Sequence, residues 1–335
     1  MSTATRVLVT GGTGTTGRRV TARLVAAGHA VRVASRHPGP AVDDGTAAGP
    51  DPAAAHGTTA GLAPAAGLET ARFDWNDPAT HAPALDGVRR VYLVAPVGAP
   101  DPAAPMLPFL DRARGAGVER VVLLGSSAIA ETDEGLGEVY RGIRERFPQW
   151  AVLRPSWFMQ NFTGDHVHAQ SIRERGEIVT ATGDGRVAFI DADDIAEVAA
   201  RALTDERPHN AAPLITGPEA LSYADAAATL TRVTGRTVRH RAVSREAMRD
   251  RLTATGLPEP FADLLAGMDE AIAGGAEDRT SDVVERVTGR APRTFAAHVA
   301  AHLARAGHAA HPTQAADPTY TAHPTHAAPT TPERL

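Results

Sequence analysis

The stretch RVLVTGGTGTTGRRV, residues 6–20, decides the fold of this chain. Its first part, Val7–Thr10, is a short β-branched apolar run that is typical of a buried strand. Glycines follow at once, and apolar residues then recur at helical spacing up to Gly28, where the helix is expected to end. A second strand is predicted at Val31–Ala34. Strand, glycine turn, helix and strand make a βαβ unit, which requires a parallel pair of strands and a right-handed crossover.

The same alternation continues through the first half of the chain. Further strands are predicted at Thr70–Phe73, Arg90–Ala95, Val121–Gly125 and Ala151–Leu153. Helices are predicted between most of them, including Met106–Gly115 and Leu136–Phe147. This alternation predicts an α/β fold with an open, doubly wound parallel sheet, and we assign residues 1–155 to this first domain.

Residues 156–305 predict a smaller lobe of mixed α/β structure. Its expected elements are a strand at Gly185–Ile190, a helix capped by Asp191, a strand at Leu214–Thr216, a helix at Tyr223–Thr234 capped by Ser222, an extended stretch at Thr237–Ala242 and helices over most of Arg245–Ala304. We expect this lobe to be interleaved with the sheet rather than to form an independent repeat.

Two segments depart from these patterns. Residues 37–68 are rich in Ala, Gly, Pro and Thr with almost no large apolar residue, so we predict a flexible insertion. Residues 306–335 offer too little apolar area to offset the entropy of ordering, so we predict a disordered tail. His298 and His302 stand four residues apart on a predicted helix, but they lack a third ligand at a fixed spacing, and we expect no metal site.

Composition excludes several classes of protein. The 335 residues carry a net charge of −5 and no basic cluster, which disfavours a nucleic-acid partner. No apolar run approaches the ~20 residues of a membrane span, so we expect a cytoplasmic protein with no membrane partner. Cysteine is absent, which excludes thiolate nucleophiles, and all 34 basic residues are arginine, which excludes lysine chemistry. We expect a monomer or homodimer that acts on a small molecule.

The glycines carry the first functional signal. They form the pattern G-x-x-G-x-x-G directly between a strand and a helix. Such a turn needs glycine for positive φ and for close backbone approach, and the helix N-terminus then faces a pyrophosphate. A tight turn without a ligand is the other interpretation, which the βαβ context disfavours. The residues expected to bind the cofactor here are Gly11, Thr13, Gly14, Thr15, Thr16 and Gly17.

The end of the second strand indicates which dinucleotide is bound. An NAD site places an acidic residue there, whereas this strand ends in Ser35 and Arg36. Arg36 can pair with a 2′-phosphate and Ser35 can add a hydroxyl, so we expect NADP(H) to be preferred over NAD(H). A solvated arginine at a strand end is the other interpretation. Asp74 and Trp75, just past the third strand, either lie near the adenine or serve as a helix-capping Asp and a packed Trp.

Several segments together resemble the NmrA-like branch of the atypical short-chain dehydrogenase superfamily. They are TGGTGTTGRRV, VRVASRHP, FDWNDPAT, VYLVAP, LRPSWFMQNF, FIDADDIAEVAARAL and LITGPEALSYADAAATLTRVTGR, between Arg6 and Leu303. FDW and RPSWFMQNF are most similar to ergot-alkaloid-type reductases and their bacterial relatives. The resemblance implies a Rossmann domain that binds NAD(P)(H), with Ala95 and Pro96 at the cofactor, and a small C-terminal substrate lobe. The family includes reductases, quinone oxidoreductases and redox-sensing regulators without activity.

A proton donor is harder to find. The wider superfamily uses a Tyr-x-x-x-Lys pair, and the nearest match is Tyr140 followed by Arg144. Tyr140 stands in register with apolar residues of a predicted helix, so core packing is favoured over catalysis. His166 and His168 are the other catalytic candidates, because imidazole is the best solvent-coupled acid at neutral pH. As plain loop histidines they would be solvated.

The substrate side is expected at the carboxyl ends of the later strands. Ser126 and Ser127 close the fifth strand, and they either contact a ligand or are plain strand-end serines. The segment after the sixth strand holds four bulky apolar residues in six positions, although aromatics are only 4% of the chain. In it Trp157 and Phe158 suit a wall for a flat substrate, and the amide of Asn161 could orient either the cofactor or the substrate.

These observations favour an NADPH-dependent reductase of a flat, electron-poor small molecule, such as an imine, iminium, enone or quinone, in secondary metabolism. Carbonyl reduction needs help for the developing alkoxide, whereas an iminium or a quinone is already electrophilic. Positioning then supplies a large part of the rate. Two other functions stay open on the sequence alone, namely a dinucleotide sensor without chemistry and a non-redox cyclase or isomerase.

Overall fold

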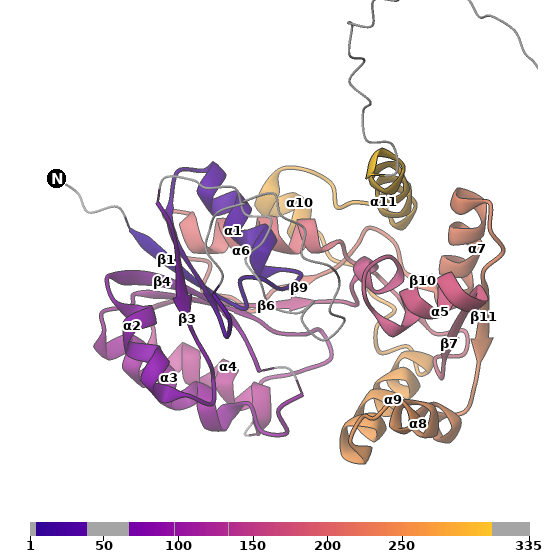
Figure 1. Cartoon of the computed structure of the whole chain (residues 1–335), viewed down its shortest axis with the longest axis horizontal. Coiled ribbons are helices and arrows are strands. Elements are labelled where there is room, and N and C mark those ends of the chain that lie inside the picture. Colours follow the sequence, from indigo (N-terminus) through magenta and orange to yellow (C-terminus); the bar gives the residue numbers. More distant parts are fainter. Residues whose placement is uncertain (1–4, 39–66, 97, 133, 310–335) are drawn as a thin grey trace, which may run out of the picture.

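The computed structural model describes residues 5–38, 67–96, 98–132 and 134–309. They contain a seven-stranded sheet in the order β3-β2-β1-β4-β5-β6-β9, with every pairing parallel (Figure 1). The strands are β1 (Arg6–Thr10), β2 (Ala30–Ser35), β3 (Leu68–Arg72), β4 (Val88–Val94), β5 (Arg120–Leu124), β6 (Gln149–Pro155) and β9 (Leu214–Ile215). The strand order reverses between β1 and β4, and this switch point is where open α/β sheets bind ligands.

Helices cover both faces of the sheet, because alternate residues of a strand point to opposite faces. Val7 and Val9 pack into one core, together with α1 (Gly17–Ala26), α6 (Ala192–Thr204) and α10 (Val283–Thr288). Leu8 packs into the other core, together with α2 (His81–Leu85), α3 (Ala103–Gly115) and α4 (Gly135–Arg146). The structure therefore confirms the doubly wound α/β sheet.

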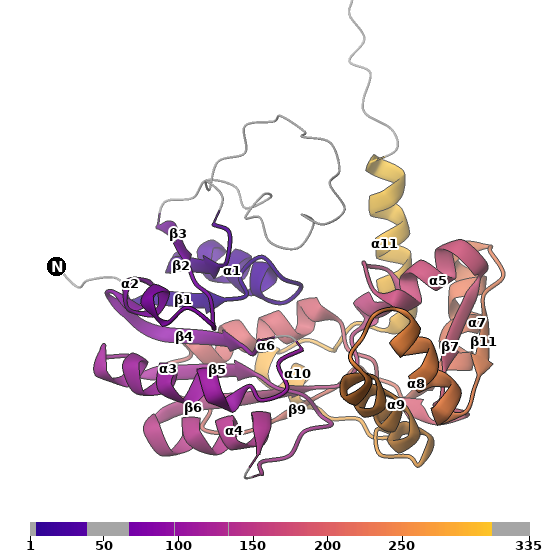
Figure 2. The same cartoon turned by 60° about the horizontal axis from the view of Figure 1, so that its bottom comes forward.

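The C-terminal half forms a smaller lobe beside the sheet. Its elements are η2 (Met159–Phe162), α5 (Val167–Arg175), β7 (Glu177–Thr180), β8 (Arg186–Val187), β10 (Leu221–Ser222), α7 (Tyr223–Thr234), β11 (Arg239–Ala242), α8 (Arg245–Ala254), α9 (Glu259–Ala273) and α11 (Phe295–Ala309). Strands β8 and β10 pair antiparallel, and β7 and β11 pair parallel. Figures 1 and 2 show α5, α7, α8 and α9 at one end of the molecule, with α2 and α3 at the other.

The chain passes between the two parts more than once. It leaves the carboxyl end of β6 directly into η2, whose Met159 and Phe162 belong to the core of the lobe. It returns to the sheet with α6, β9 and α10. These returning elements come from the second half of the chain, so the two parts are not separated by one point in the sequence. The boundary between residues 155 and 156 stays a proposal.

Most predicted elements are present, with ends shifted by a few residues. Asp191 caps α6 through the Asp193 N–H, and Ser222 caps α7 in a reciprocal capping box with Asp225. Three expectations need correction. The strand predicted at Gly185–Ile190 is only the short β8, Leu68 belongs to β3 rather than to the insertion, and α11 continues to Ala309 beyond the predicted start of the tail.

The predictions of a flexible insertion and of a disordered tail fall mostly on residues 39–66 and 310–335. These lie outside the residues that the structure describes. Within the described part of the chain, no helix is long and apolar enough to cross a membrane. The same residues contain no group of three or more acidic, His or Cys side chains arranged to hold a metal ion.

Candidate functional site

The glycine loop joins β1 to α1 through unusually close backbone contacts. Gly11 has a φ of +59°, which favours glycine. A Cβ at Gly17 would collide with the carbonyl oxygen of Gly11, and a Cβ at Gly12 would collide with the side chain of Val33. Gly14 is less constrained, because its Cβ would meet only the Gly11 oxygen at 3.2 Å. Gly12, which the sequence pattern did not single out, is thus a steric requirement of the loop.

The N-terminus of α1 is left open toward this loop. Its N-cap residue Thr16 makes no side-chain capping bond, and the first turn contains no acidic residue. The first N–H groups of a helix have no partner within the helix, and they carry a partial positive charge. Thr13 is half-buried and Thr15 is exposed, so the backbone here is accessible to an anion. This arrangement fits a pyrophosphate.

The carboxyl end of β2 lies next to the glycine loop, because the Gly12 N–H donates to the carbonyl of Ala34 at 3.3 Å. Ser35 is 7% exposed, and its buried hydroxyl has no hydrogen-bond partner among the described residues. Arg36 beside it is exposed. An unpartnered buried hydroxyl next to a solvent-facing guanidinium fits a phosphate ester that both would contact.

Arg72 is a second arginine at this edge. It stands in register with Ser35 on the neighbouring strand β3, and its guanidinium lies 3.3 Å from the carboxylate of Asp77. Sequence reasoning missed Arg72, because only the parallel register brings it level with the end of β2.

Trp75 links the loop after β3 to the end of β4. Its indole N–H donates to the carbonyl of Val94 at 3.2 Å, and its ring packs edge-on against Phe73 and Phe109 at centroid distances of 4.9 and 5.2 Å. Trp75 is thus a packed residue that holds the chain just before Ala95 and Pro96. Asp74 is not the helix cap that one interpretation expected, because Asp77 caps the short helix η1 (Pro78–Thr80) instead.

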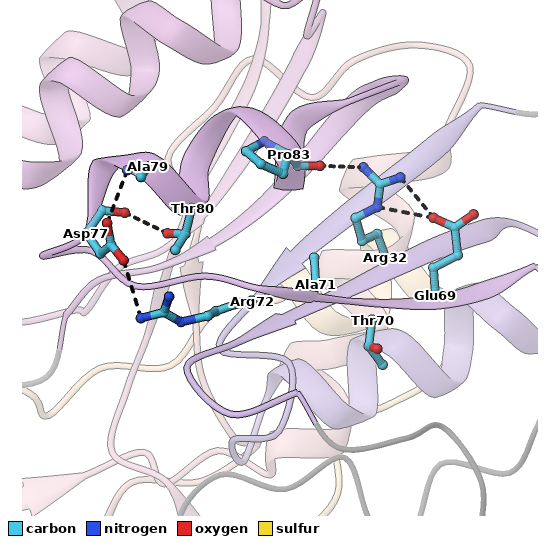
Figure 3. A pocket seen from close by; sticks show the side chains of 9 residues that line it. All are labelled: Arg32, Glu69, Thr70, Ala71, Arg72, Asp77, Ala79, Thr80 and Pro83. Carbon is cyan, nitrogen blue, oxygen red and sulfur yellow. Dashed lines mark hydrogen bonds and ion pairs between the residues drawn. The ribbon is translucent and has the colours of Figure 1, made fainter.

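A large open hollow lies on the flank of the edge strand β3 (Figure 3). Its volume is about 700 Å³, and apart from Arg72 none of the residues considered for the cofactor or the substrate lines it. Figure 3 shows that its charged side chains are already paired, Arg32 with Glu69 at 2.9 Å and Arg72 with Asp77. We therefore place the functional site at the carboxyl edge of the sheet and not in this hollow.

The aromatic segment after β6 lies between the two parts of the molecule. Trp157 is half-buried against the core of the lobe, and Phe158 is half-buried against the core of the sheet. The other two bulky residues, Met159 and Phe162, are at most 3% exposed and belong to the lobe core. Asn161 is half-buried and follows one turn after Phe158. Two of the four bulky residues are therefore available as a wall, and two are structural.

Buried polar atoms without partners gather at the ends of β5 and β6. The hydroxyls of Ser127 and Ser156 have no partner among the described residues, and both residues are 3% exposed. Arg154 and Arg279 each donate to the carbonyl of Ser127 at 3.2 Å. Glu277 is 3% exposed and lies 3.3 Å from Arg279. Ser126 differs from Ser127, since its hydroxyl accepts the Ala128 N–H.

Sequence reasoning missed Ser156, Arg154 and the pair Glu277 and Arg279. Arg154 and Ser156 stood inside the quoted RPSWFMQNF segment, where the aromatics gave the stronger signal. Glu277 and Arg279 lie in a loop without a recognisable motif, and only the folded chain brings them to Ser127.

Tyr140 is placed in the core rather than in a cavity. It is 3% exposed, and its hydroxyl accepts the Ser126 N–H at 3.1 Å. Burial raises the pKa of this phenol, so it is a poor proton donor near neutral pH. The geometry gives Tyr140 a packing role that positions the end of β5, as the favoured interpretation expected.

Neither His166 nor His168 is suited to donate a proton. His166 caps α5, and its Nδ1 accepts the His168 N–H at 3.2 Å. Burial lowers the pKa of His166, and burial with neighbouring charges lowers the pKa of His168 to about 3. The ring of His168 stacks on Phe162 at a centroid distance of 6.1 Å. Both imidazoles are therefore neutral near pH 7, and we withdraw His166 as the acid.

Comparison with known proteins begins with a family model described as NAD(P)H-binding, which matches residues 11–206. The chain is 44% identical over 298 residues to the uncharacterized oxidoreductase YesF of Bacillus subtilis, covering 89% of this chain and 95% of that protein. It is 38% identical to an NAD(P)H azoreductase of Xenophilus azovorans, covering 72% and 85%. It is 37% identical to an agroclavine dehydrogenase of Claviceps fusiformis, covering 68% and 81%.

Solved structures show the same fold at lower identity. The NADPH complex of the quinone oxidoreductase QOR2 from Escherichia coli is 23% identical, with a TM-score of 0.70 over 89% of this chain and 99% of that one. NmrA, a negative transcriptional regulator solved with NAD, is 13% identical, with a TM-score of 0.68 over 92% and 98%. Enzymes and a regulator therefore share this architecture.

Proposed function

The chain belongs to the NAD(P)H-binding family, in its NmrA-like branch, and it is an oxidoreductase; we propose that it uses NADPH to reduce a flat, electron-poor small molecule. The substrate class comprises imines, iminium ions, enones, quinones and related conjugated acceptors. The observation that carries the proposal is the position of Trp157 and Phe158. They are half-buried at the same carboxyl edge of the sheet as the glycine loop, one against each core.

The cofactor would be held by residues that already fit it. The open N-terminus of α1 and the loop from Gly11 to Gly17 would take the pyrophosphate, and Ser35 and Arg36 would take the 2′-phosphate. Ala95 and Pro96 would line the path of the nucleoside, at the end of β4 that the Trp75 indole holds in place. When bound, the nicotinamide supplies a hydride.

The residues of the substrate side would position the substrate rather than protonate it. Trp157 and Phe158 would stack on a planar ring and exclude water, and Asn161 would orient it through its amide. Ser127 and Ser156 would offer hydroxyls that are not engaged elsewhere in the described residues. An iminium ion becomes neutral when it accepts a hydride, and the anions formed from the other acceptors would take their proton from water, so no acidic side chain is required; this matches the buried Tyr140 and a chain without lysine.

The relatives support this substrate class. An azoreductase is named for the azo bond, which is a conjugated and electron-poor acceptor, and it is 38% identical to this chain. The agroclavine dehydrogenase is named for a small molecule, and it is 37% identical. The resemblance to ergot-alkaloid reductases supports secondary metabolism as the setting.

The direct test is oxidation of NADPH by the purified protein in the presence of a quinone, an iminium salt, an enone or an azo dye. We expect turnover with at least one of these acceptors, and a lower KM for NADPH than for NADH. Absence of oxidation with every acceptor, while NADPH binds, would contradict the proposed substrate class. Conversion of an acceptor without oxidation of NADPH would favour a cyclase or isomerase.

A further inference from the structure

A second cavity lies in the lobe, and none of the proposed cofactor or substrate residues lines it. Its volume is about 190 Å³, and it is enclosed by residues of α5, α7 and α11 together with the chain that follows η2 and α7. We call it the α7–α11 pocket. Pockets for drug-sized ligands begin at roughly 300 Å³. A ligand that fills this pocket must therefore be small.

The interior of the α7–α11 pocket is apolar. Phe162, Leu230 and Val299 line it, and each is at most 3% exposed. They belong to the core of the lobe, so the wall is held in place by packing around it. A preformed apolar wall of this kind favours a ring or a short alkyl chain.

The rim of the pocket is cationic. Arg173 donates to the carbonyl of Gly164 at 2.9 Å, and Arg236 donates to the carbonyl of Arg173 at 3.2 Å. Within the described residues, both guanidinium groups thus bond to carbonyls, and neither forms an ion pair with a carboxylate. None of the lining residues is Asp or Glu. The positive charge at the rim is not neutralised from within.

His302 on the same wall is affected by this charge. Burial lowers the pKa of its imidazole, and His298, Arg305 and Arg173 lower it further. The side chain is therefore neutral near pH 7 and adds a hydrogen-bonding group rather than a third charge. The pocket as a whole combines an apolar interior with two available cations.

We propose that the α7–α11 pocket binds a small amphiphilic carboxylate, with an aromatic ring or a short alkyl chain. The apolar part would contact Phe162, Leu230 and Val299, and the carboxylate would pair with Arg173 or Arg236. Arginine is suited to this task because its planar fork binds a carboxylate through two parallel hydrogen bonds. The lining of this pocket includes none of the residues proposed for the cofactor or the substrate, and the proposal does not depend on the proposed reaction.

Titration calorimetry with benzoate, octanoate and the neutral benzyl alcohol tests the chemistry. NADP⁺ is present throughout, so that the pyrophosphate site is filled. We expect benzoate or octanoate to bind and benzyl alcohol to bind at least roughly tenfold more weakly, as the loss of a charge-assisted hydrogen bond implies. If neither carboxylate binds at millimolar concentration, or if the alcohol binds as tightly, the proposal is wrong.

Matched variants locate the binding. Arg236→Gln removes a rim cation, and Leu303→Glu places an opposing charge on a lining residue that is 39% exposed. Each should weaken carboxylate binding roughly tenfold or more. Their controls are Arg232→Gln, an exposed arginine of α7 outside the pocket, and Leu264→Glu, a 52% exposed leucine of α9. Equal effects of test and control variants would place the carboxylate elsewhere and overturn the assignment.

Discussion

At the scale of single residues, the expected preference for NADP(H) over NAD(H) depends on Ser35 and Arg36. Ser35 holds a buried hydroxyl without a partner in the described chain, and Arg36 is exposed beside it. Within the described residues, neither side chain has a partner, in contrast to Arg32 on the same strand, which is paired with Glu69 and donates to carbonyls of α2. This difference is why we assign Arg36 to a ligand.

Arg36→Ala should weaken NADPH binding by one to two decades and leave NADH binding nearly unchanged. A charge-assisted hydrogen bond contributes roughly 1.5–3 kcal/mol, and NADH lacks the phosphate that would receive it. Fluorescence titration of both cofactors measures the effect. The control is Arg89→Ala, an exposed arginine paired with Glu119 near the opposite end of the strands. Equal losses for both cofactors would mean that Arg36 does not contact the 2′-phosphate.

Tyr140→Phe should leave kcat largely intact and lower stability slightly. The substitution removes the acceptor of the Ser126 N–H, and a lost hydrogen bond costs roughly 0.5–1.5 kcal/mol. A general acid would contribute a factor of about 10² to 10⁴ in rate. Steady-state kinetics and denaturant unfolding on the same preparation separate the two roles. A rate loss of that size with unchanged stability would make Tyr140 the proton donor.

His168 should make the protein less stable in acid. Its pKa in the folded chain is about 3, whereas an exposed histidine has a pKa near 6.5, so between these values the unfolded chain binds more protons. The free energy of unfolding therefore falls as the pH is lowered from about 6.5 toward 3. His168→Gln should make this fall shallower, as measured by urea unfolding across that range. Parallel curves for the variant and the wild type would contradict the burial of His168.

At the scale of elements, the turns and caps were the parts best predicted from the sequence. Ser222 and Asp225 form the capping box of α7, and Asp191 caps α6, because a cap needs only a few neighbouring residues of the right type. Among the elements that were missed are α5 and β7, and α5 is capped by a histidine rather than by Ser, Thr, Asp or Asn. Helix α5 has few apolar residues, and strand β7 is only four residues long.

The glycines of the β1–α1 loop should not tolerate alanine equally. Gly17→Ala should lower stability and abolish cofactor binding, because its Cβ would collide with the Gly11 carbonyl. Gly14→Ala should keep the fold, since its Cβ would meet only one oxygen at 3.2 Å. Gly115→Ala at the end of α3 is the control, with open space around the added Cβ. Thermal unfolding ranks the three variants, and equal losses for Gly14 and Gly17 would contradict the difference in free space between the two positions.

At the scale of the whole molecule, the doubly wound sheet could be predicted from the sequence, and the contacts that complete the candidate site could not. Alternating strands and helices with a glycine turn specify the doubly wound sheet and the edge at which it binds ligands. The pairs that complete this edge are long-range. Arg279 reaches Ser127 across 152 positions of sequence, and Phe158 meets Ile190 through a backbone bridge. Local patterns carry no information on such contacts.

The surroundings of His168 could not be predicted either. In the sequence it stands in a segment without a clear pattern, whereas in the folded lobe its ring packs against Phe162 and Tyr223. Likewise, the sequence shows four bulky residues close together, but not that Met159 and Phe162 belong to the core of the lobe. Burial of a short segment depends on what the rest of the chain places against it.

The central claim is that Trp157 forms a substrate wall at the edge where the cofactor is presented. A single-turnover measurement tests it, with protein saturated with NADPH and mixed with an acceptor on which the wild type is active. Trp157→Ala should slow the transfer by on the order of 10²-fold through loss of positioning, with NADPH affinity unchanged. The control is Trp150→Ala, at a half-buried tryptophan near the start of β6, the strand that precedes Trp157. It should leave the transfer rate nearly unchanged. An unchanged rate for Trp157→Ala, or an equal loss for Trp150→Ala, would contradict the account.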